Sequence, residues 1–148
     1  MIFNLRKEIE NEPNEPYAVL PSEALKNNGL KFIRPSPGEV KKKFDIAKGI
    51  QGMEITIKDK KIKAVSNGSV IMVNGNSESG YLVGIQHDNG FISLYYNNSK
   101  VLKKPGNFVK GGDVIAEIDI KLKPGKDLYF ELWQNGSPVN PQEFINFK

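Results

Sequence analysis

The sequence predicts an all-β domain, a β-sandwich or partly closed barrel of short antiparallel strands, preceded by a short and partly helical N-terminal extension. The main observation is a series of short runs, from Phe32 onward, that are rich in β-branched and aromatic residues and are separated by Gly, Asn and Pro. Apolar and polar residues alternate along these runs, and no segment after Gly29 has the apolar spacing of a long amphipathic helix.

The extension covers residues 1–31 and the β domain covers residues 32–148. Several prolines and glutamates in the first half of the extension favour an extended arm. The stretch from Ser22 to Gly29 has the serine N-cap and the glycine stop of a short helix. We expect the extension to be a linker or a docking segment.

The β domain is expected to contain strands that are separated by tight turns at Asn67-Gly68, Asp88-Asn89-Gly90 and Asn135-Gly136. In chain order, the expected strands are residues 53–57, 62–66, 69–74, 81–87, 91–96, 113–120 and 128–134.

Composition limits the possible function classes. The 148 residues, of which 39% are hydrophobic, are enough for one domain with a core. The absence of cysteine excludes disulfides, thiolate metal sites and cysteine nucleophiles; it fits an extracytoplasmic bacterial protein and leaves a cytoplasmic location open. The formal net charge of +4 is compatible with weak attraction to anionic polymers or membranes, and we expect no nucleic-acid partner.

No stretch has the run of about 20 apolar residues that crosses a membrane, and residues 1–11 lack the apolar run of a signal peptide. We therefore expect either a cytoplasmic protein or an envelope protein whose signal or anchor is absent from this chain.

Four segments, in order, carry a family resemblance: residues 35–45 (PSPGEVKKKFD), 52–55 (GMEI), 89–95 (NGFISLY) and 128–141 (LYFELWQNGSPVNP). Together they resemble the lysostaphin/LytM-type zinc endopeptidases, which cut peptidoglycan cross-bridges. Residues 101–116 are similar to the hairpin that this family places before its second metal motif. The likeness spans residues 33–147 and implies a LytM-type β domain.

The family's enzymes bind zinc through a His-x-x-x-Asp pair and the second histidine of a His-x-His strand. Three such ligands leave a fourth position where a water molecule becomes a nucleophile. The resemblance places the first histidine position on Ile50, the aspartate position on Glu54 and the strand ligand on Tyr129. Two further histidines, which assist the metal-bound water, correspond to Asp127 and Asn97.

These substitutions predict that the zinc site is lost. Isoleucine has no ligand atom, and a neutral tyrosine is a poor ligand because its ordinary pKa is about 10. Asn97 does not titrate, and Asp127 is a weak base. We expect no metal, no cofactor and no catalytic residue, so the domain is interpreted as a pseudo-metallopeptidase.

The remaining polar and aromatic residues allow more than one interpretation. Glu54 and Asp127 could supply oxygen ligands to calcium, although two solvated polar groups at a lost site are preferred. The single histidine, His87, is expected to lie at the surface or in a hairpin. The candidate groove residues are Tyr95, Tyr96 and Trp133, with Tyr129 filling the cleft floor.

Two lysine-rich stretches, residues 41–43 and 58–63, could contact anionic glycan, lipid or an acidic partner, but they are interpreted as solvated faces.

The function expected from this resemblance is a catalytically inactive LytM-type domain at the bacterial cell envelope. It would bind, scaffold or activate, and its partner would be peptidoglycan or an envelope protein, such as a hydrolase or a component of a division or morphogenesis complex. Alternatives are an atypical active peptidoglycan endopeptidase and a peptidoglycan-binding module. A carrier domain of the biotinyl or lipoyl type is discounted because the turns at residues 67–68 and 88–90 contain no lysine.

Overall fold

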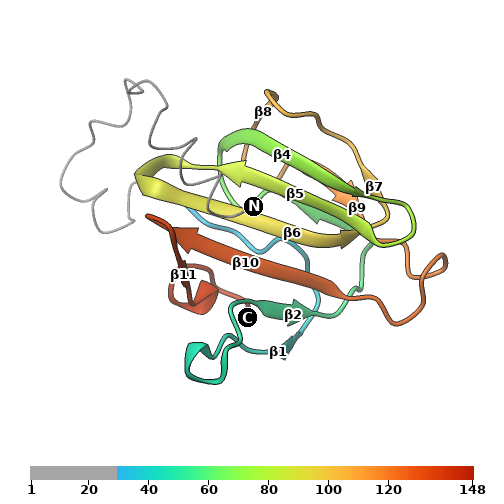
Figure 1. Cartoon of the computed structure of the whole chain (residues 1–148), viewed down its shortest axis with the longest axis horizontal. Helices are drawn as coiled ribbons and strands as arrows, with labels where there is room; N and C mark the ends of the chain where they lie inside the picture. The colour runs from blue at the N-terminus through green and yellow to red at the C-terminus, as the bar shows by residue number, and fades with distance from the viewer. Residues whose placement is uncertain (1–29) are drawn as a thin grey trace.

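The computed structural model describes residues 30–148, which form two antiparallel β-sheets joined by loops and short 3-10 helices (Figure 1). The short helix expected between Ser22 and Gly29 therefore lies outside the described residues. Within residues 30–148, no helix has the length and apolar character needed to cross a bilayer. The all-β fold class expected from the sequence is confirmed.

The larger sheet has eight strands in the order β1-β2-β10-β6-β5-β4-β8, and β11 pairs with β10 at one end. Its bounds are β1 Val40–Lys42, β2 Met53–Ile55, β4 Gly68–Asn76, β5 Gly80–Gln86, β6 Phe91–Asn98, β8 Phe108–Val109, β10 Leu128–Gln134 and β11 Ser137–Val139.

The smaller sheet has three strands in the order β3-β9-β7. They are β3 Lys61–Lys63, β7 Lys100–Val101 and β9 Val114–Glu117, and the 3-10 helices are η3 Ile46–Lys48, η4 Asp88–Gly90 and η5 Pro141–Glu143.

The expected strands and turns largely occur, with two kinds of difference. Three strands end earlier than expected: those predicted over residues 53–57, 62–66 and 113–120 end at Ile55, Lys63 and Glu117. After the last of them the chain turns at Asp119, whose carbonyl accepts from the Leu122 N–H. Four short strands, β1, β7, β8 and β11, were not expected, since two or three residues are too few to show alternation.

The core lies between the two sheets. Inward side chains of the large sheet, including Ile55, Val83, Phe91 and Phe130, pack with Ile62 and Ala116 of the small sheet, and all are fully buried. Because successive residues of a strand point to opposite faces, the intervening residues of β2, β5, β6 and β10 lie on the other face of the large sheet, here called the outer face. Glu54 and Tyr129, two of the positions that the resemblance assigned to zinc chemistry, lie on this face.

Candidate functional site

Tyr129 lies at the centre of the candidate site, on the outer face. Strand β10 places it in register with Glu54 of β2 on one side and with Tyr96 of β6 on the other. The rings of Tyr96 and Tyr129 are in contact, with centroids 5.2 Å apart and tilted by 58°. The structure therefore brings together Glu54 and Tyr129, two of the three assigned ligand positions, with one of the expected groove residues.

Glu131 is the most connected group of the site, and sequence reasoning missed it. The residue is 6% exposed, and its carboxylate accepts from the Tyr129 hydroxyl at 2.9 Å on Oε2 and from the Trp133 Nε1–H at 2.9 Å on Oε1. The Tyr96 hydroxyl lies 3.4 Å from Oε1. The alternation of Tyr129, Glu131 and Trp133 along one strand was the signal that could have revealed this cluster.

This arrangement holds Tyr129 in its neutral form. Burial raises the pKa of the Tyr129 hydroxyl above its ordinary value, and the hydrogen bond to the Glu131 carboxylate raises it further. The pKa of Tyr96 is raised by burial and by the same carboxylate. A tyrosine binds a metal well only as phenolate, so the protein disfavours the form that could replace the missing histidine.

Asp127 and Asn97, the positions of the two assisting histidines, are held by local contacts. The Asp127 carboxylate accepts from the Lys41 Nζ at 2.9 Å, and this contact raises the pKa of the exposed Lys41 amine. Asn97 has a left-handed backbone with φ of 75°, and its amide donates to the backbone carbonyl of Asp127 at 2.9 Å. The Asn97 amide does not titrate, and the Asp127 carboxylate is paired with a lysine.

Ile50 closes a small loop at the edge of the site. Its backbone pairs with that of Asp45 on both sides, with N···O distances of 2.9 Å, and this pairing encloses η3. Two residues later Gly52 packs against the ring of Tyr129 and the side chain of Glu131, and a Cβ there would lie 2.8 Å from both. The first ligand position is thus a half-buried aliphatic side chain next to a tightly packed glycine.

The residues at the assigned positions do not fit zinc. One side chain has no donor atom, a second is a neutral phenol bound to a carboxylate, and Glu54 alone remains as an ordinary ligand. Among residues 30–148, no group of three or more His, Cys, Asp or Glu side chains is arranged to hold a metal ion. We therefore derive no metal-dependent step for this site.

Two positions expected from the sequence need correction. Tyr95 does not line a groove: it is fully buried in the core, because on β6 it alternates with the outward Tyr96 and points to the opposite face. His87 lies directly before the expected hairpin turn at η4, so the hairpin location is confirmed, but the surface location is wrong because the residue is only 5% exposed. Both of its ring nitrogens are hydrogen bonded.

An apolar cluster extends the site along the outer face. We call this the outer cluster; it comprises Leu82, Ile92 and Leu94, which are buried, and Ile71, Met72, Tyr96 and Trp133, which are partly exposed around them. Trp133 and Tyr96 belong to this cluster as well as to the contacts of Glu131. The outer face therefore offers a polar end around Tyr129 and an apolar surface over β4, β5 and β6.

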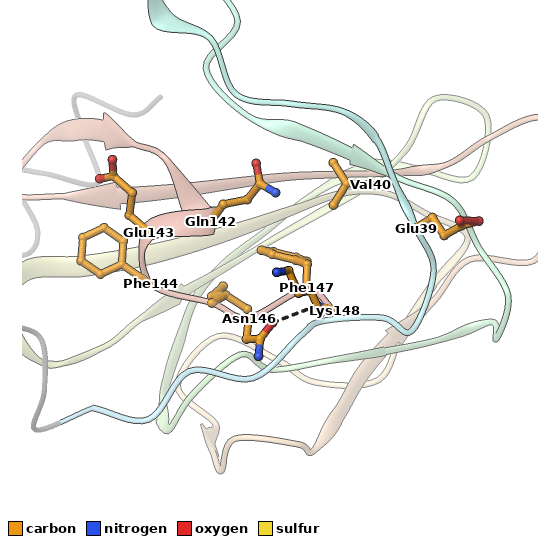
Figure 2. Close-up of a pocket in the computed structure, with 9 residues that line it drawn as sticks. Glu39, Val40, Gln142, Glu143, Phe144, Asn146, Phe147 and Lys148 are labelled. Atoms are coloured by element: carbon orange, nitrogen blue, oxygen red, sulfur yellow. Dashed lines mark hydrogen bonds between the residues drawn. The ribbon is translucent and has the colours of Figure 1, made fainter.

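A separate cavity of about 600 Å³ lies between β1 and the C-terminal segment (Figure 2). Its lining includes Glu39, Val40 and Phe147, and none of the assigned ligand positions. Tyr129, Glu131 and Asp127 do not line this cavity either.

The fold and the site define a metallopeptidase-like β domain in which the residues at the ligand positions do not form a zinc site. The sequence pattern of peptidase family M23 matches residues 48–141, and the chain belongs to this family, as the lysostaphin/LytM resemblance implied.

Three similarities illustrate the relationship. The murein hydrolase activator EnvC of Escherichia coli is 34% identical over 85 residues, which is 57% of this chain and 20% of EnvC. Stage II sporulation protein Q of Bacillus subtilis is 28% identical over 106 residues, 70% of this chain and 38% of that protein. The crystal structure of a putative peptidase M23 from Pseudomonas aeruginosa matches with a TM-score of 0.66 and 25% identity, over 80% of this chain and 52% of that one. The chain thus spans well under half the length of the two curated relatives.

Proposed function

We propose that this domain is a non-catalytic member of family M23 that acts by binding at the bacterial cell envelope, as a scaffold or as an activator of a murein hydrolase. The observation that carries the proposal is the hydrogen bond from the Tyr129 hydroxyl to the buried Glu131, which commits a ligand position to an internal contact. A relative that is named as a murein hydrolase activator, EnvC, supports this assignment.

The outer cluster is the surface that we assign to partner binding. Its rim of Ile71, Met72, Tyr96 and Trp133 supplies aliphatic, aromatic and thioether groups, the kinds of side chain that are enriched at protein interfaces. An extended segment of a partner protein could lie along these strands and exclude water from the rim. This composition favours a protein partner over glycan.

The loss of zinc chemistry can be tested by metal content and by activity. The 148-residue chain, purified without chelator, is expected to hold far less than one equivalent of zinc and to release no soluble muropeptides from sacculi. The matched control is the triple variant Ile50→His/Glu54→Asp/Tyr129→His, which restores the three ligands and is expected to bind about one equivalent. Tightly bound zinc in the unsubstituted chain, or muropeptide release that a chelator abolishes, would contradict the proposal.

Partner binding can be tested with a purified cell-wall amidase and labelled sacculi. The chain is expected to increase label release by the amidase, and Trp133→Ala is expected to weaken this effect about tenfold because tryptophans at interfaces often dominate binding. Phe108→Ala is the control, since Phe108 is an exposed aromatic residue outside the outer cluster. If Trp133→Ala and Phe108→Ala weaken the stimulation of the amidase equally, the outer cluster is not the binding surface.

Co-sedimentation with sacculi tests a second candidate function, direct binding of peptidoglycan. Saturable binding that survives moderate salt, without an effect on the amidase, would make the domain a peptidoglycan-binding module. Binding to sacculi that disappears when the salt concentration is raised modestly would favour a protein as the partner.

A further inference from the structure

The loop of residues 119–126, between β9 and β10, presents aliphatic side chains to solvent. Leu122 is 71% exposed and Ile120 is 47% exposed, and Leu122 is the most exposed large hydrophobic residue among residues 30–148. Burial of such side chains is favourable, so this pair would gain free energy if an apolar phase covered it. The loop projects beyond the ends of β6 and β10 (Figure 1).

The loop has a defined backbone. Asp119 anchors it: its carbonyl accepts from the N–H groups of Leu122 and Lys123 at 3.1 and 3.2 Å, and its Oδ1 accepts from the Lys121 N–H at 2.9 Å. The Asp119 N–H donates to the Ser99 hydroxyl, which ties the loop to the neighbouring strand connection. The aliphatic side chains are therefore displayed by a turn held at its base.

Lysines surround the aliphatic pair. Lys121, Lys123 and Lys126 lie in the loop, and further lysines lie at its base, where Ile118 donates its N–H to the Lys60 carbonyl. Glu117 is in register with a lysine on each side. At this end six lysines outnumber three carboxylates; they are Lys60, Lys61, Lys100, Lys121, Lys123, Lys126, Asp59, Glu117 and Asp119. Asp127, which follows Lys126, is paired with Lys41.

The carboxylates at this end already have partners. Asp59 accepts from the backbone N–H of Lys61, and Glu117 lies 3.9 Å from the Lys60 amine. Asp119 caps its own loop. In the part of the chain that the structure describes, the amines of Lys121, Lys123 and Lys126 have no carboxylate within ion-pair distance. The positive charge of the loop is therefore available to an external anion.

We propose that the 119–126 loop docks on an anionic lipid bilayer, with Leu122 and Ile120 in the interfacial region and the flanking lysines on the headgroup phosphates. Lysines alone would suit any polyanion. Burial of the exposed aliphatic pair adds binding free energy only where an apolar phase lies next to the negative charges. The surface of an anionic bilayer has this arrangement. The outer cluster is a different surface and shares no residue with this loop. The proposal is independent of the proposed partner binding.

The test is co-sedimentation of the 148-residue chain with phosphatidylcholine vesicles, with and without phosphatidylglycerol. Binding is expected only with phosphatidylglycerol and is expected to fall with added salt. Ile120→Ser/Leu122→Ser and Lys121→Gln/Lys123→Gln are each expected to reduce the partition coefficient about tenfold. Phe108→Ser, at an exposed site on β8, is expected to bind as the unsubstituted chain does.

Each outcome has a definite meaning. No binding to phosphatidylglycerol vesicles would overturn the proposal, as would equal loss in the Phe108→Ser control. Binding that needs the lysines but not the aliphatic pair, and that soluble polyphosphate competes away, would assign the loop to a polyanion and would also overturn it. Because the substituted side chains are exposed or half-exposed, unchanged thermal unfolding of the variants is expected and excludes misfolding as the cause.

Discussion

Glu131→Ala is expected to lower the free energy of unfolding by about 3 kcal/mol. The change removes the acceptor of the Tyr129 hydroxyl and the Trp133 Nε1–H, and the more distant Tyr96 hydroxyl loses the same carboxylate. Hydrogen bonds to a charged group are stronger than neutral ones. A donor that loses its acceptor in a partly buried site also destabilises the folded state, because it has given up its hydrogen bonds to water. The measurement is urea unfolding at neutral pH, compared with the unsubstituted chain.

A double-mutant cycle separates this network from simple loss of packing. If Tyr129 and Glu131 act as a unit, Glu131→Ala should cost less in the Tyr129→Phe background, with a coupling energy of about 1 to 2 kcal/mol. Glu131→Gln is the size-matched control. The glutamine amide oxygen can still accept a hydrogen bond, but its NH2 group would face donors. We therefore expect a decrease in the free energy of unfolding that is smaller than in Glu131→Ala. Strict additivity of the two single changes would show that the hydrogen bond contributes little.

This network explains why the candidate site could be only partly predicted from the sequence. The family resemblance placed Glu54 and Tyr129 at ligand positions, and the structure pairs them across neighbouring strands. Neither Lys41 nor Glu131 belongs to the zinc motif, so nothing in that motif pointed to the contacts that close the site. Those contacts join residues that lie two positions apart on one strand or 86 positions apart in the chain.

The fold was more accessible to prediction, and its misses have physical causes. Alternation identifies strands that bury one face, which is why β10 was predicted with its observed bounds, Leu128–Gln134. It does not say which face of a strand meets the core. Tyr95 and Tyr96 are adjacent tyrosines with equal propensity, and only the packing of the small sheet against one face assigns the first to the core and the second to the outer face.

The burial of His87 is another result of packing that composition could not reveal. Its ring lies against Phe32, with centroids 6.1 Å apart, and its Nδ1 lies 2.7 Å from the Asn67 carbonyl oxygen. A carbonyl can only accept, so Nδ1 carries the proton and Nε2, 2.7 Å from the Ser93 hydroxyl, accepts. The Ser93 and Tyr95 hydroxyls lie 2.7 Å apart, and the Val65 N–H donates to the Tyr95 oxygen, so a buried chain of hydrogen bonds links the imidazole to the backbone of Val65.

This geometry predicts a loss of stability in mild acid. Burial lowers the pKa of His87 to about 4, below the ordinary value of 6.5 that the unfolded chain has. Between these values the unfolded state binds a proton that the folded state does not, so the free energy of unfolding falls as the pH falls. The contribution is fully present above pH 6.5, and about 3 kcal/mol of it is expected to be lost by pH 4.

The expected result is a free energy of unfolding that decreases from pH 7 to pH 4 in the unsubstituted chain and decreases by about 3 kcal/mol less in His87→Gln, which is not protonated in this range. The difference between the two curves isolates His87 from the carboxylates, which both proteins share. Since the chain has one histidine, nitrogen NMR of the imidazole gives a direct second measurement: the neutral ring protonated on Nδ1 should persist below pH 5.5. A folded-state titration near pH 6.5, or parallel curves for the two proteins, would mean that the ring is not held neutral by the buried hydrogen-bond chain.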